Sequence, residues 1–327
     1  MGVMPIGRMI VAAALGLSLV PARAQDWPTR PLTMVVPFAA GGPADVLARI
    51  IDPQMSTLLG QQVIVENMGG AGGITGSLRV AKAAPDGYQL VMGTQGTHAQ
   101  NQALYKNPPY HPLADFAPLG LIVMTPLVLI TRKDLPASDF KEFIAYFKSH
   151  HGGMQFGSAG TGSGTHLGCV LLNAALGANV THVPYRGSAL AMQDLQAGRI
   201  DYMCDVVSTA LPQIEGGTVK AMAVLNRERS PVLPDVPTAQ EQGLADFEAP
   251  GWFAFFLPKG TPPPIVSRLN HALSDTLDRP VVRGRLEGLG MGVPPAERRS
   301  PDYLARFVAS EIEKWAAPIR AAGINLD

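Results

Sequence analysis

The feature that most constrains the fold is a repeated order of elements. A strand, a glycine-rich loop and a helix follow one another at two places in the chain. The apolar segment 32–38 leads into the loop 39–43 and then into a segment of helical periodicity. The segment 154–157 leads in the same way into the loop 160–164 and a second helical segment. In open α/β sheets ligands bind beyond the carboxyl ends of the strands, where such helices begin. Two units that face each other would therefore direct two helix N-termini into one cleft.

The remaining apolar segments continue the alternation of strands and helices. Further strands are expected at 62–66, 88–92, 179–184, 201–205 and 219–225. Helices are expected at 44–59, 74–84, 138–149, 165–176 and 188–197, the third with Ser138 as its N-cap. The apolar run 116–130 is interrupted at Thr125 and Pro126 and fits either two strands or one bent strand. This order predicts βαβ units and an α/β fold with mixed, mainly parallel sheets.

The N-terminus has the pattern of a signal peptide. Arg8 is followed by an uncharged run of 11 residues, 10–20, and by the sequence ARA at 22–24, which fits cleavage before Gln25. The run is too short for a membrane-spanning helix, which needs about 20 residues. We therefore expect a periplasmic protein from which 1–24 are removed. The mature chain then has 24 basic and 26 acidic residues, a net charge of −2.

The composition bounds the class of protein. Hydrophobic residues make up 46% of the 327 residues and charged residues only 16%, whereas disordered chains combine low hydrophobicity with high net charge. A formal net charge of zero excludes a broadly basic surface for nucleic acid. The length predicts about two domains. In an oxidising compartment Cys169 and Cys204 can form a disulfide, the alternative being two buried free thiols.

The first glycine-rich loop offers backbone N–H groups to an anion. Glycine lets the backbone approach a ligand closely, and a helix N-terminus carries unpaired donors and partial positive charge. We expect the N–H groups of 39–42 to contact a carboxylate or phosphate, while Asp45 caps the helix or contacts the ligand itself. The loop has neither the Walker A pattern nor the GxGxxG pattern, so a nucleotide is not expected.

The second glycine-rich loop, 157–167, is richer in hydroxyl groups. Ser158, Ser163 and Thr165 add side-chain donors to the backbone donors of this loop. Ser158 or Ser163 with His166 leaves open the alternative of a secreted serine hydrolase. The loop lacks the pattern Gly-x-Ser-x-Gly, and a histidine three residues after a serine rarely has triad geometry. We expect His166 to lie near the mouth of the cleft or to bind an anion.

Two further segments are candidates for ligand contact. The glycine-rich run 69–73 precedes a helix and is either a third anion-facing loop or a flexible connection. Gln95 and Thr97 follow the strand 88–92, at a carboxyl end where side chains meet a ligand. The histidines show no spacing typical of metal ligands, so neither a metal nor a cofactor is expected.

Taken together in order, several motifs resemble one family over essentially the whole mature chain. They are WPTRP at 27–31, VPFAAGGPAD at 36–45, PDGY at 85–88, GSAGTGSGTHL at 157–167, HVPYRG at 182–187, DLQAGRID at 194–201 and GWF at 251–253. These motifs are similar to those of the Bug receptors, the extracytoplasmic solute-binding proteins of the tripartite tricarboxylate transporter family. One departure is the alanine pair at 39–40, where relatives often carry Pro or Gly beside the glycines.

The resemblance implies a two-domain periplasmic binding protein of type II, the Venus-flytrap class, which clamps a small carboxylate between its domains. It places one domain at 25–124 and 249–327 and the other at 125–248. Asp205 either receives an ammonium or hydroxyl group of the ligand or makes a structural bond. The expected ligand-binding residues are Phe38, Ala39, Ala40, Gly41, Gly42, Gln95, Thr97, Ser158, Ala159, Gly160, Gly164, Thr165, His166, Tyr185, Gly187 and Asp205.

The resemblance also implies a function and partners. We expect a monomeric, non-enzymatic receptor that captures a mono- or dicarboxylate, aromatic acids included, and delivers it to the subunits of a membrane carrier. A sensory receptor that acts through a sensor kinase without a carrier is the alternative. A nucleic acid is not expected as a partner. The apolar residues Tyr202 and Met203 near the second loop favour an aliphatic or aromatic acid over a citrate-like one.

Overall fold

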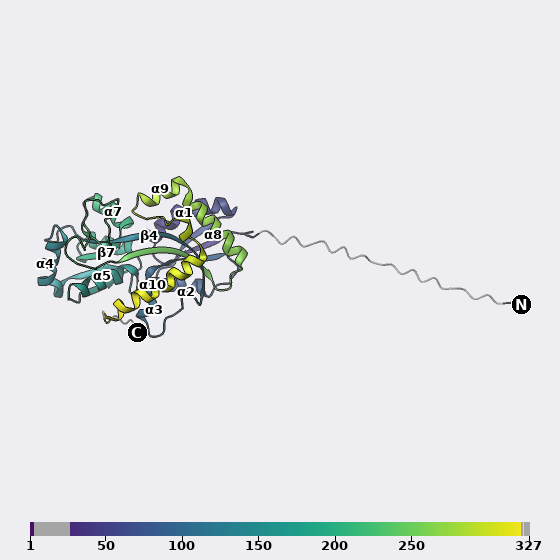
Figure 1. Cartoon of the computed structure of the whole chain (residues 1–327), viewed down its shortest axis with the longest axis horizontal. Coiled ribbons are helices and arrows are strands. Elements are labelled where there is room, and N and C mark those ends of the chain that lie inside the picture. Colours follow the sequence, from purple (N-terminus) through teal and green to yellow (C-terminus); the bar gives the residue numbers. More distant parts are fainter. Residues whose placement is uncertain (3–26, 322, 324–327) are drawn as a thin grey trace.

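The computed structural model describes residues 1–2, 27–321 and 323 as an α/β fold. The strands of this part of the chain follow one path in the order β2-β1-β3-β9-β4-β7-β5-β6, and β8 pairs with β4. Figure 1 shows two halves, with α1, α8 and α9 in one and α4, α5 and α7 in the other. Residues 3–24 of the predicted signal peptide lie outside the described residues. No helix of the described part has the length and hydropathy to cross a membrane.

The first half combines the N-terminal and C-terminal parts of the chain. Its strands are β1 (Leu32–Val36), β2 (Val63–Asn67), β3 (Gln89–Thr94), the first part of β4 (Phe116–Arg132) and β9 (Pro250–Pro258). Its helices are α1 (Pro43–Leu59), η1 (Ala71–Gly73), α2 (Ile74–Ala81), the π-helical η2 (Gly96–Gln100), α3 (Asn101–Leu104), α8 (Pro263–Asp278), α9 (Pro280–Glu287), η4 (Ala296–Arg298) and α10 (Pro301–Ala321). One apolar cluster joins the sheet to α1 and α8, and another joins it to α10.

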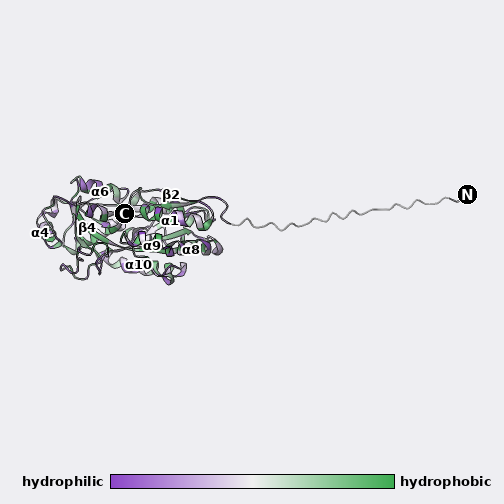
Figure 2. Cartoon of the chain, turned by 90° about the horizontal axis from the view of Figure 1, so that it is seen from above, coloured by the Kyte–Doolittle hydropathy of each residue, from purple (hydrophilic) through white to green (hydrophobic). Residues whose placement is uncertain are grey.

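The second half is formed by the middle of the chain. Its strands are the last part of β4, β5 (Gln155–Ser158), β6 (Thr181–Pro184), β7 (Tyr202–Val206) and β8 (Val219–Val224). Its helices are α4 (Phe140–His150), η3 (His151–Gly153), α5 (Gly164–Ala175), α6 (Ser188–Gln196) and α7 (Val207–Glu215). Two further apolar clusters cover the two faces of this sheet. In Figure 2 hydrophobic colour lies along β4, and hydrophilic colour gathers on outer helices such as α8 and α10.

The two halves are joined through β4 and β9. β4 is one strand of 17 residues, so the alternative of two separate strands is excluded. Its first part pairs with β9, and from Leu127 onward it pairs with β7 and β8. At the crossing Thr125 lies opposite Gly251, and Pro126 lies opposite Pro250. The chain therefore passes from one half to the other on two adjacent antiparallel strands.

The predicted α/β fold with mixed sheets is confirmed. Among the described strands, four pairings are parallel and four are antiparallel. The parallel pairings join β1 to β2 and β3, and β5 to β6 and β7, as the βαβ order predicts. Each antiparallel pairing involves β4 or β9. Parallel pairings are thus half of the total rather than the majority, because these two strands cross between the halves.

The N-cap of α4 is Asp139, not the predicted Ser138. The carboxylate of Asp139 accepts a hydrogen bond of 2.8 Å from the backbone N–H of Glu142. Ser138 instead donates its hydroxyl to the carboxylate of Glu142, at 2.6 Å. Both residue types are favourable caps, so composition does not decide between them. The helix begins at Phe140 because that side chain is the first of the buried face that continues at Phe143 and Phe147.

Cys169 and Cys204 form a disulfide whose Cα atoms are 5.4 Å apart. Both residues are fully buried. The predicted pairing is therefore confirmed, and the alternative of two free thiols is excluded in this structure. The bond ties α5, which begins at the second glycine-rich loop, to β7, which ends next to that loop.

Candidate functional site

A cavity lies between the two halves, close to the crossing of β4 and β9. It encloses about 520 Å³ of space that protein atoms do not fill, part of it open to solvent. Its apolar lining consists of Phe38, Pro43, Ala44, Leu127, Ala159, Val206, Trp252 and Phe253. Its polar side chains and glycines are Thr94, Gln95, Gly96, Thr125, Ser163, Gly164, Thr165, Ser188 and Gly251.

The N-termini of three helices line this cavity. The lining contains Pro43 and Ala44 from the start of α1, Gly164 and Thr165 from the start of α5, and Ser188 from the start of α6. N–H groups in a first helical turn have no acceptor within the helix and carry partial positive charge. No described residue of the lining has an ionisable side chain. The cavity is therefore suited to an anion that is held without a counter-charge.

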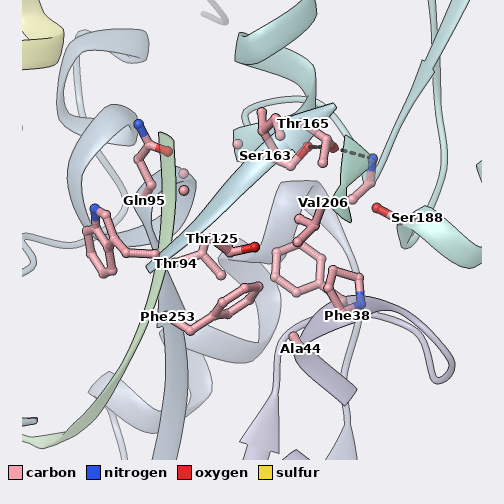
Figure 3. A pocket seen from close by; sticks show the side chains of 17 residues that line it. Phe38, Ala44, Thr94, Gln95, Thr125, Ser163, Thr165, Ser188, Val206 and Phe253 are labelled. Carbon is pink, nitrogen blue, oxygen red and sulfur yellow. Dashed lines mark hydrogen bonds between the residues drawn. The ribbon is translucent and has the colours of Figure 1, made fainter. Parts of the chain in front are cut away.

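Hydroxyl groups fix the shape of the second glycine-rich loop. Ser163 is the N-cap of α5, and its hydroxyl accepts a 3.2 Å hydrogen bond from the N–H of His166. The hydroxyl of Thr165 accepts a 2.9 Å hydrogen bond from the N–H of Ala159 and lies 3.1 Å from the hydroxyl of Ser163. Figure 3 shows Ser163 and Thr165 together at one side of the cavity. These bonds hold the N-terminus of α5 toward the cavity.

The first glycine-rich loop uses part of its backbone within the protein. The N–H of Gly41 donates to the carboxylate of Asp45 at 2.9 Å, and the N–H of Ala39 donates to the carbonyl oxygen of Arg186 at 2.9 Å. The second of these bonds joins the two halves. Burial raises the pKa of Asp45, but hydrogen bonds from Arg49, Gly41 and Asn67 outweigh it and lower that pKa below its usual value. Asp45 is therefore ionised, but it is not the predicted N-cap of α1: Gly42 has that position, and Asp45 lies in the first turn, where it holds the loop through Gly41.

The structure brings only some of the predicted ligand-binding residues to the cavity. Those in the lining are Phe38, Gln95, Ala159, Gly164 and Thr165. Those outside the described lining are Ala39, Ala40, Gly41, Gly42, Thr97, Ser158, Gly160, His166, Tyr185, Gly187 and Asp205. Gly42 directly precedes the lining residue Pro43, and Gly187 directly precedes Ser188. The two predicted loops therefore lie at the site, but many of their residues lie next to the cavity lining rather than in it.

Thr97 and Ser158 have structural partners. The hydroxyl of Thr97 accepts a 2.9 Å hydrogen bond from the N–H of Thr94 and lies 2.8 Å from Nδ1 of His98. The hydroxyl of Ser158 lies 2.7 Å from Nε2 of His182 and accepts a hydrogen bond from the N–H of Gly160. Both hydroxyl groups are buried. They organise the ends of β3 and β5 beneath the cavity.

Tyr185 and Asp205 also bond within the protein. The hydroxyl of Tyr185 donates to Asp194 at 2.7 Å. Asp205 is fully buried, which raises its pKa, and one of its oxygens accepts a 2.7 Å hydrogen bond from Thr209. Its other oxygen has no hydrogen-bond partner, although Ser188 lies near enough to lower the pKa of this carboxyl group. Of the two predicted roles for Asp205, this geometry favours the structural one.

The serine and histidine residues do not form the pairs that the hydrolase alternative requires. The bond between Ser163 and His166 runs from the backbone N–H of His166, not from its ring. Nδ1 of His166 accepts from the N–H of Gly162, and its ring lies 4.1 Å from that of His182. Ser158 contacts His182 instead, but Ser158 is fully buried and outside the described lining. In the described part of the chain no cluster of three or more His, Cys, Asp or Glu is arranged to hold a metal.

Several lining residues are not among the predicted ones. Thr125 and Gly251 mark the crossing, Trp252 and Phe253 follow on β9, and Ser188 opens α6. The side-chain oxygens of Thr125 and Ser188 are buried without a hydrogen-bond partner, and in Figure 3 they point toward the space between them. The signal for Trp252 was its place in the GWF motif at the expected crossing. Thr125 was marked only as the interruption of the run 116–130 and as a domain boundary, and Ser188 carried no distinct signal, because serine at a helix start is common.

Glycines allow the two halves to approach each other beside the cavity. A Cβ atom at Gly96 would lie 2.6 Å from the N atom of Gly164, and one at Gly69 would lie 2.8 Å from the carbonyl oxygen of Arg186. One at Gly72 would overlap the carbonyl oxygen of Thr161. The run 69–73 is therefore neither a third anion-facing loop in the lining nor a free connection. It is part of the contact between the halves.

Comparisons with known proteins agree with this architecture. Residues 47–324 match the family described as the tripartite tricarboxylate transporter family receptor. The chain is 44% identical over 316 residues to the UPF0065 protein in the TAR-I ttuE-ttuC' intergenic region of Agrobacterium vitis, covering 96% of this chain and 91% of that one.

Two solved structures are similar along nearly the whole chain. The periplasmic binding protein BugD is 41% identical with a TM-score of 0.89, covering 92% of this chain and 100% of that one. MatC from Rhodopseudomonas palustris, solved with bound malate, is 45% identical with a TM-score of 0.87, covering 90% of this chain and 100% of that one.

Proposed function

Because the chain belongs to the tripartite tricarboxylate transporter receptor family, we propose that it captures a small organic acid in the cavity between its halves. The ligand is a mono- or dicarboxylate, and the receptor delivers it to the membrane carrier subunits of its transport system. The observation that carries this proposal is the set of three helix N-termini around a cavity without ionisable side chains. Removing water from a carboxylate is costly unless hydrogen-bond donors replace the water. The backbone N–H groups at the helix N-termini are such donors.

The proposal treats the two halves as domains. One comprises 25–124 and 249–327 and the other 125–248, with both boundaries at the crossing of β4 and β9. A ligand that contacts both halves binds the closed arrangement more tightly and so favours it. The hydrogen bond from Ala39 to the carbonyl oxygen of Arg186 joins the halves next to the cavity, which supports this clamp.

The protein is proposed to be a periplasmic, non-enzymatic monomer. Export with cleavage before Gln25 follows from the signal-peptide pattern. The buried pair of Ser158 and His182 lies outside the described lining, which argues against ester hydrolysis. A solved relative with bound malate supports capture of an organic acid. A sensory receptor without a carrier remains the second interpretation of the same site.

Ligand-dependent stabilisation tests the proposal. A ligand that binds only the folded state raises stability by RT ln(1 + [L]/Kd), so a binding carboxylate raises the melting temperature of the mature protein. We expect stabilisation by members of a panel of mono- and dicarboxylates and none by the corresponding amides. Ester turnover that is lost in Ser158→Ala would contradict the proposal, and so would stabilisation by the amides alone. Co-purification with carrier membrane subunits tests delivery separately.

A further inference from the structure

The two halves meet beside the cavity in a surface, which we call the seam surface, that consists of residues 39–41 and 186–190. The N–H of Ala39 donates to the carbonyl oxygen of Arg186 at 2.9 Å, which joins the halves there. A Cβ atom at Gly41 would lie 3.6 Å from the Cβ atom of Ala189. Because its parts come from both halves, the seam surface is continuous only while the halves are in contact.

Two residues of the seam surface indicate a partner outside the chain. Arg186 is exposed, and its side chain makes no ion pair or hydrogen bond with the residues that the structure describes. Leu190, four residues further along in the first turn of α6, is 40% exposed. It is one of four large apolar side chains of the described part that are exposed. The seam surface therefore offers an unpaired positive charge and an apolar contact within one short segment.

The guanidinium group of Arg186 has no role within the described protein. Arg49 of the first half, by contrast, pairs with Asp45 at 3.1 Å. The bond from Ala39 uses only the main-chain carbonyl of Arg186, which any residue would supply, and Arg186 is outside the cavity lining. Arg186 nevertheless belongs to the HVPYRG motif at 182–187. An exposed, unpaired arginine at the contact between the halves is therefore suited to an acidic partner.

We propose that the seam surface docks the receptor on its membrane carrier, through a carrier segment that combines a carboxylate with an apolar side chain. This proposal rests on the proposed function and names the docking surface and the chemistry of the partner. A carboxylate pairs with the planar guanidinium group of Arg186 through two hydrogen bonds, and an apolar side chain covers Leu190. Because the seam surface needs both halves, such a partner binds the closed arrangement more tightly than the open one. Docking at this surface therefore distinguishes the loaded receptor from the empty one.

Matched pairs of exposed residues test the docking surface. Arg285 and Val281 on α9 repeat the combination of Arg186 and Leu190, since both are exposed and four residues apart, but they belong to one half only. Figure 1 shows α9 at the upper edge of that half. Binding of the mature protein to carrier subunits in nanodiscs of neutral lipid is measured with the panel of mono- and dicarboxylates pooled in the buffer. We expect Arg186→Glu to weaken binding at least about tenfold and Leu190→Gln about fivefold, whereas Arg285→Glu and Val281→Gln leave it unchanged.

Further measurements separate docking from folding and from capture. Arg186→Lys keeps the positive charge and should lose less affinity for the carrier than Arg186→Glu. Leu190→Gln should keep the parent protein's rise in melting temperature with the pooled carboxylates, because Leu190 is outside the cavity lining. Omitting the carboxylates should weaken carrier binding of the parent protein at least about fivefold, because fewer molecules are then closed.

The possible failures point to different steps. Equal losses in the seam-surface variants and the α9 variants would overturn the docking surface, and carrier binding that does not depend on the carboxylates would overturn its link to closure. Binding to carrier-free discs of anionic phospholipid, with the same loss in Arg186→Glu, would identify a lipid surface in place of the carrier. A parent protein that binds carboxylates but never the carrier would refute delivery, and one that no carboxylate stabilises would refute capture itself.

Discussion

Oε2 of Glu311 accepts a hydrogen bond from Nε1 of Trp252 at 2.9 Å. The same oxygen accepts a second one from Nε1 of Trp315 at 3.0 Å. Trp252 lines the cavity, whereas Glu311 and Trp315 lie on α10, and all three side chains are largely buried. The C-terminal helix therefore holds the strand β9 at the point where it enters the candidate site.

Replacing Glu311 should separate charge from hydrogen bonding. Glu311→Leu leaves two buried indole N–H groups without an acceptor, each costing about 1–3 kcal/mol of the free energy of unfolding. Glu311→Gln keeps one side-chain oxygen as acceptor for both indole donors, so its free energy of unfolding should fall clearly less than that of Glu311→Leu. Chemical denaturation followed by tryptophan fluorescence measures both variants. Equal losses in the two variants would show that the negative charge, not the acceptor, is what stabilises this contact.

A methyl group at Gly96 should keep the halves apart. Its Cβ would lie 2.6 Å from the N atom of Gly164 and 2.9 Å from the carbonyl oxygen of Gly162, both across the cleft. Gly164→Ala is the matched control on the opposite side of the same contact, because its Cβ would lie 3.9 Å from the nearest atom, the N of Gly96. With a saturating ligand, small-angle scattering should give a larger radius for Gly96→Ala and an unchanged one for the control. Identical radii would mean that closure tolerates the added methyl group.

The disulfide should contribute substantially to stability. Cys169 and Cys204 are 35 residues apart, and closing a loop of this size stabilises by about 4 kcal/mol in the chain-entropy model. The double variant Cys169→Ala, Cys204→Ala should lose stability of this order in denaturant titrations without reductant. Reductant should lower the stability of the parent protein and leave the variant unchanged. Thiol titration of the denatured, unreduced protein should find no free thiol, and finding two would refute the bond.

Buried histidines should make the protein less stable in acid. Burial lowers the pKa of His166 to about 3, aided by nearby His182, and burial lowers the pKa of His182 to about 4, from 6.5 in both cases. Below pH 6.5 the unfolded state therefore binds more protons, and the folded state loses stability as the pH falls toward these lowered values. Each histidine contributes at most about 1.4 kcal/mol per pH unit.

Denaturation at pH 7 and pH 5 measures this dependence. His182→Asn should flatten the change between the two pH values, because one of the titrating groups is gone. A surface control is His150→Asn, since His150 is exposed on α4. It should leave the dependence as it is in the parent protein. A dependence that survives His182→Asn in full would rule out His182 as a contributor.

The sequence was sufficient to predict elements that local patterns specify. Parallel strands with their helices, such as β1 with α1 and β5 with α5, lie within tens of residues, and apolar periodicity with glycine punctuation marks them. β9 is not among the predicted strands, although residues 251–257 form a continuous apolar run. Its partners β3 and β4 precede it by more than a hundred residues. No local pattern specifies such a pairing.

The residues of the candidate site fall into the same two groups: those that a local pattern marks in the sequence, and those that only the tertiary fold brings to the cavity. Phe38, Gly164 and Thr165 lie in or next to loops whose glycines mark them in the sequence, and the structure places them in the cavity lining. Thr125 reaches the cavity because β4 crosses between the halves there, whereas Ser188 reaches it at the start of α6. Which N–H groups are free also depends on tertiary contacts, as the bond from Ala39 to Arg186 illustrates.

The strand β4 has a consequence for how the protein unfolds. Its 17 residues form one strand that pairs with β9 in one half and with β7 and β8 in the other, with register shifts at three points. If either half of the sheet unfolds, β4 loses its hydrogen-bond partners there, although the other half also pairs with β4. We therefore expect the two halves to unfold as one cooperative unit, with the amides along β4 exchanging with solvent only when the whole chain unfolds.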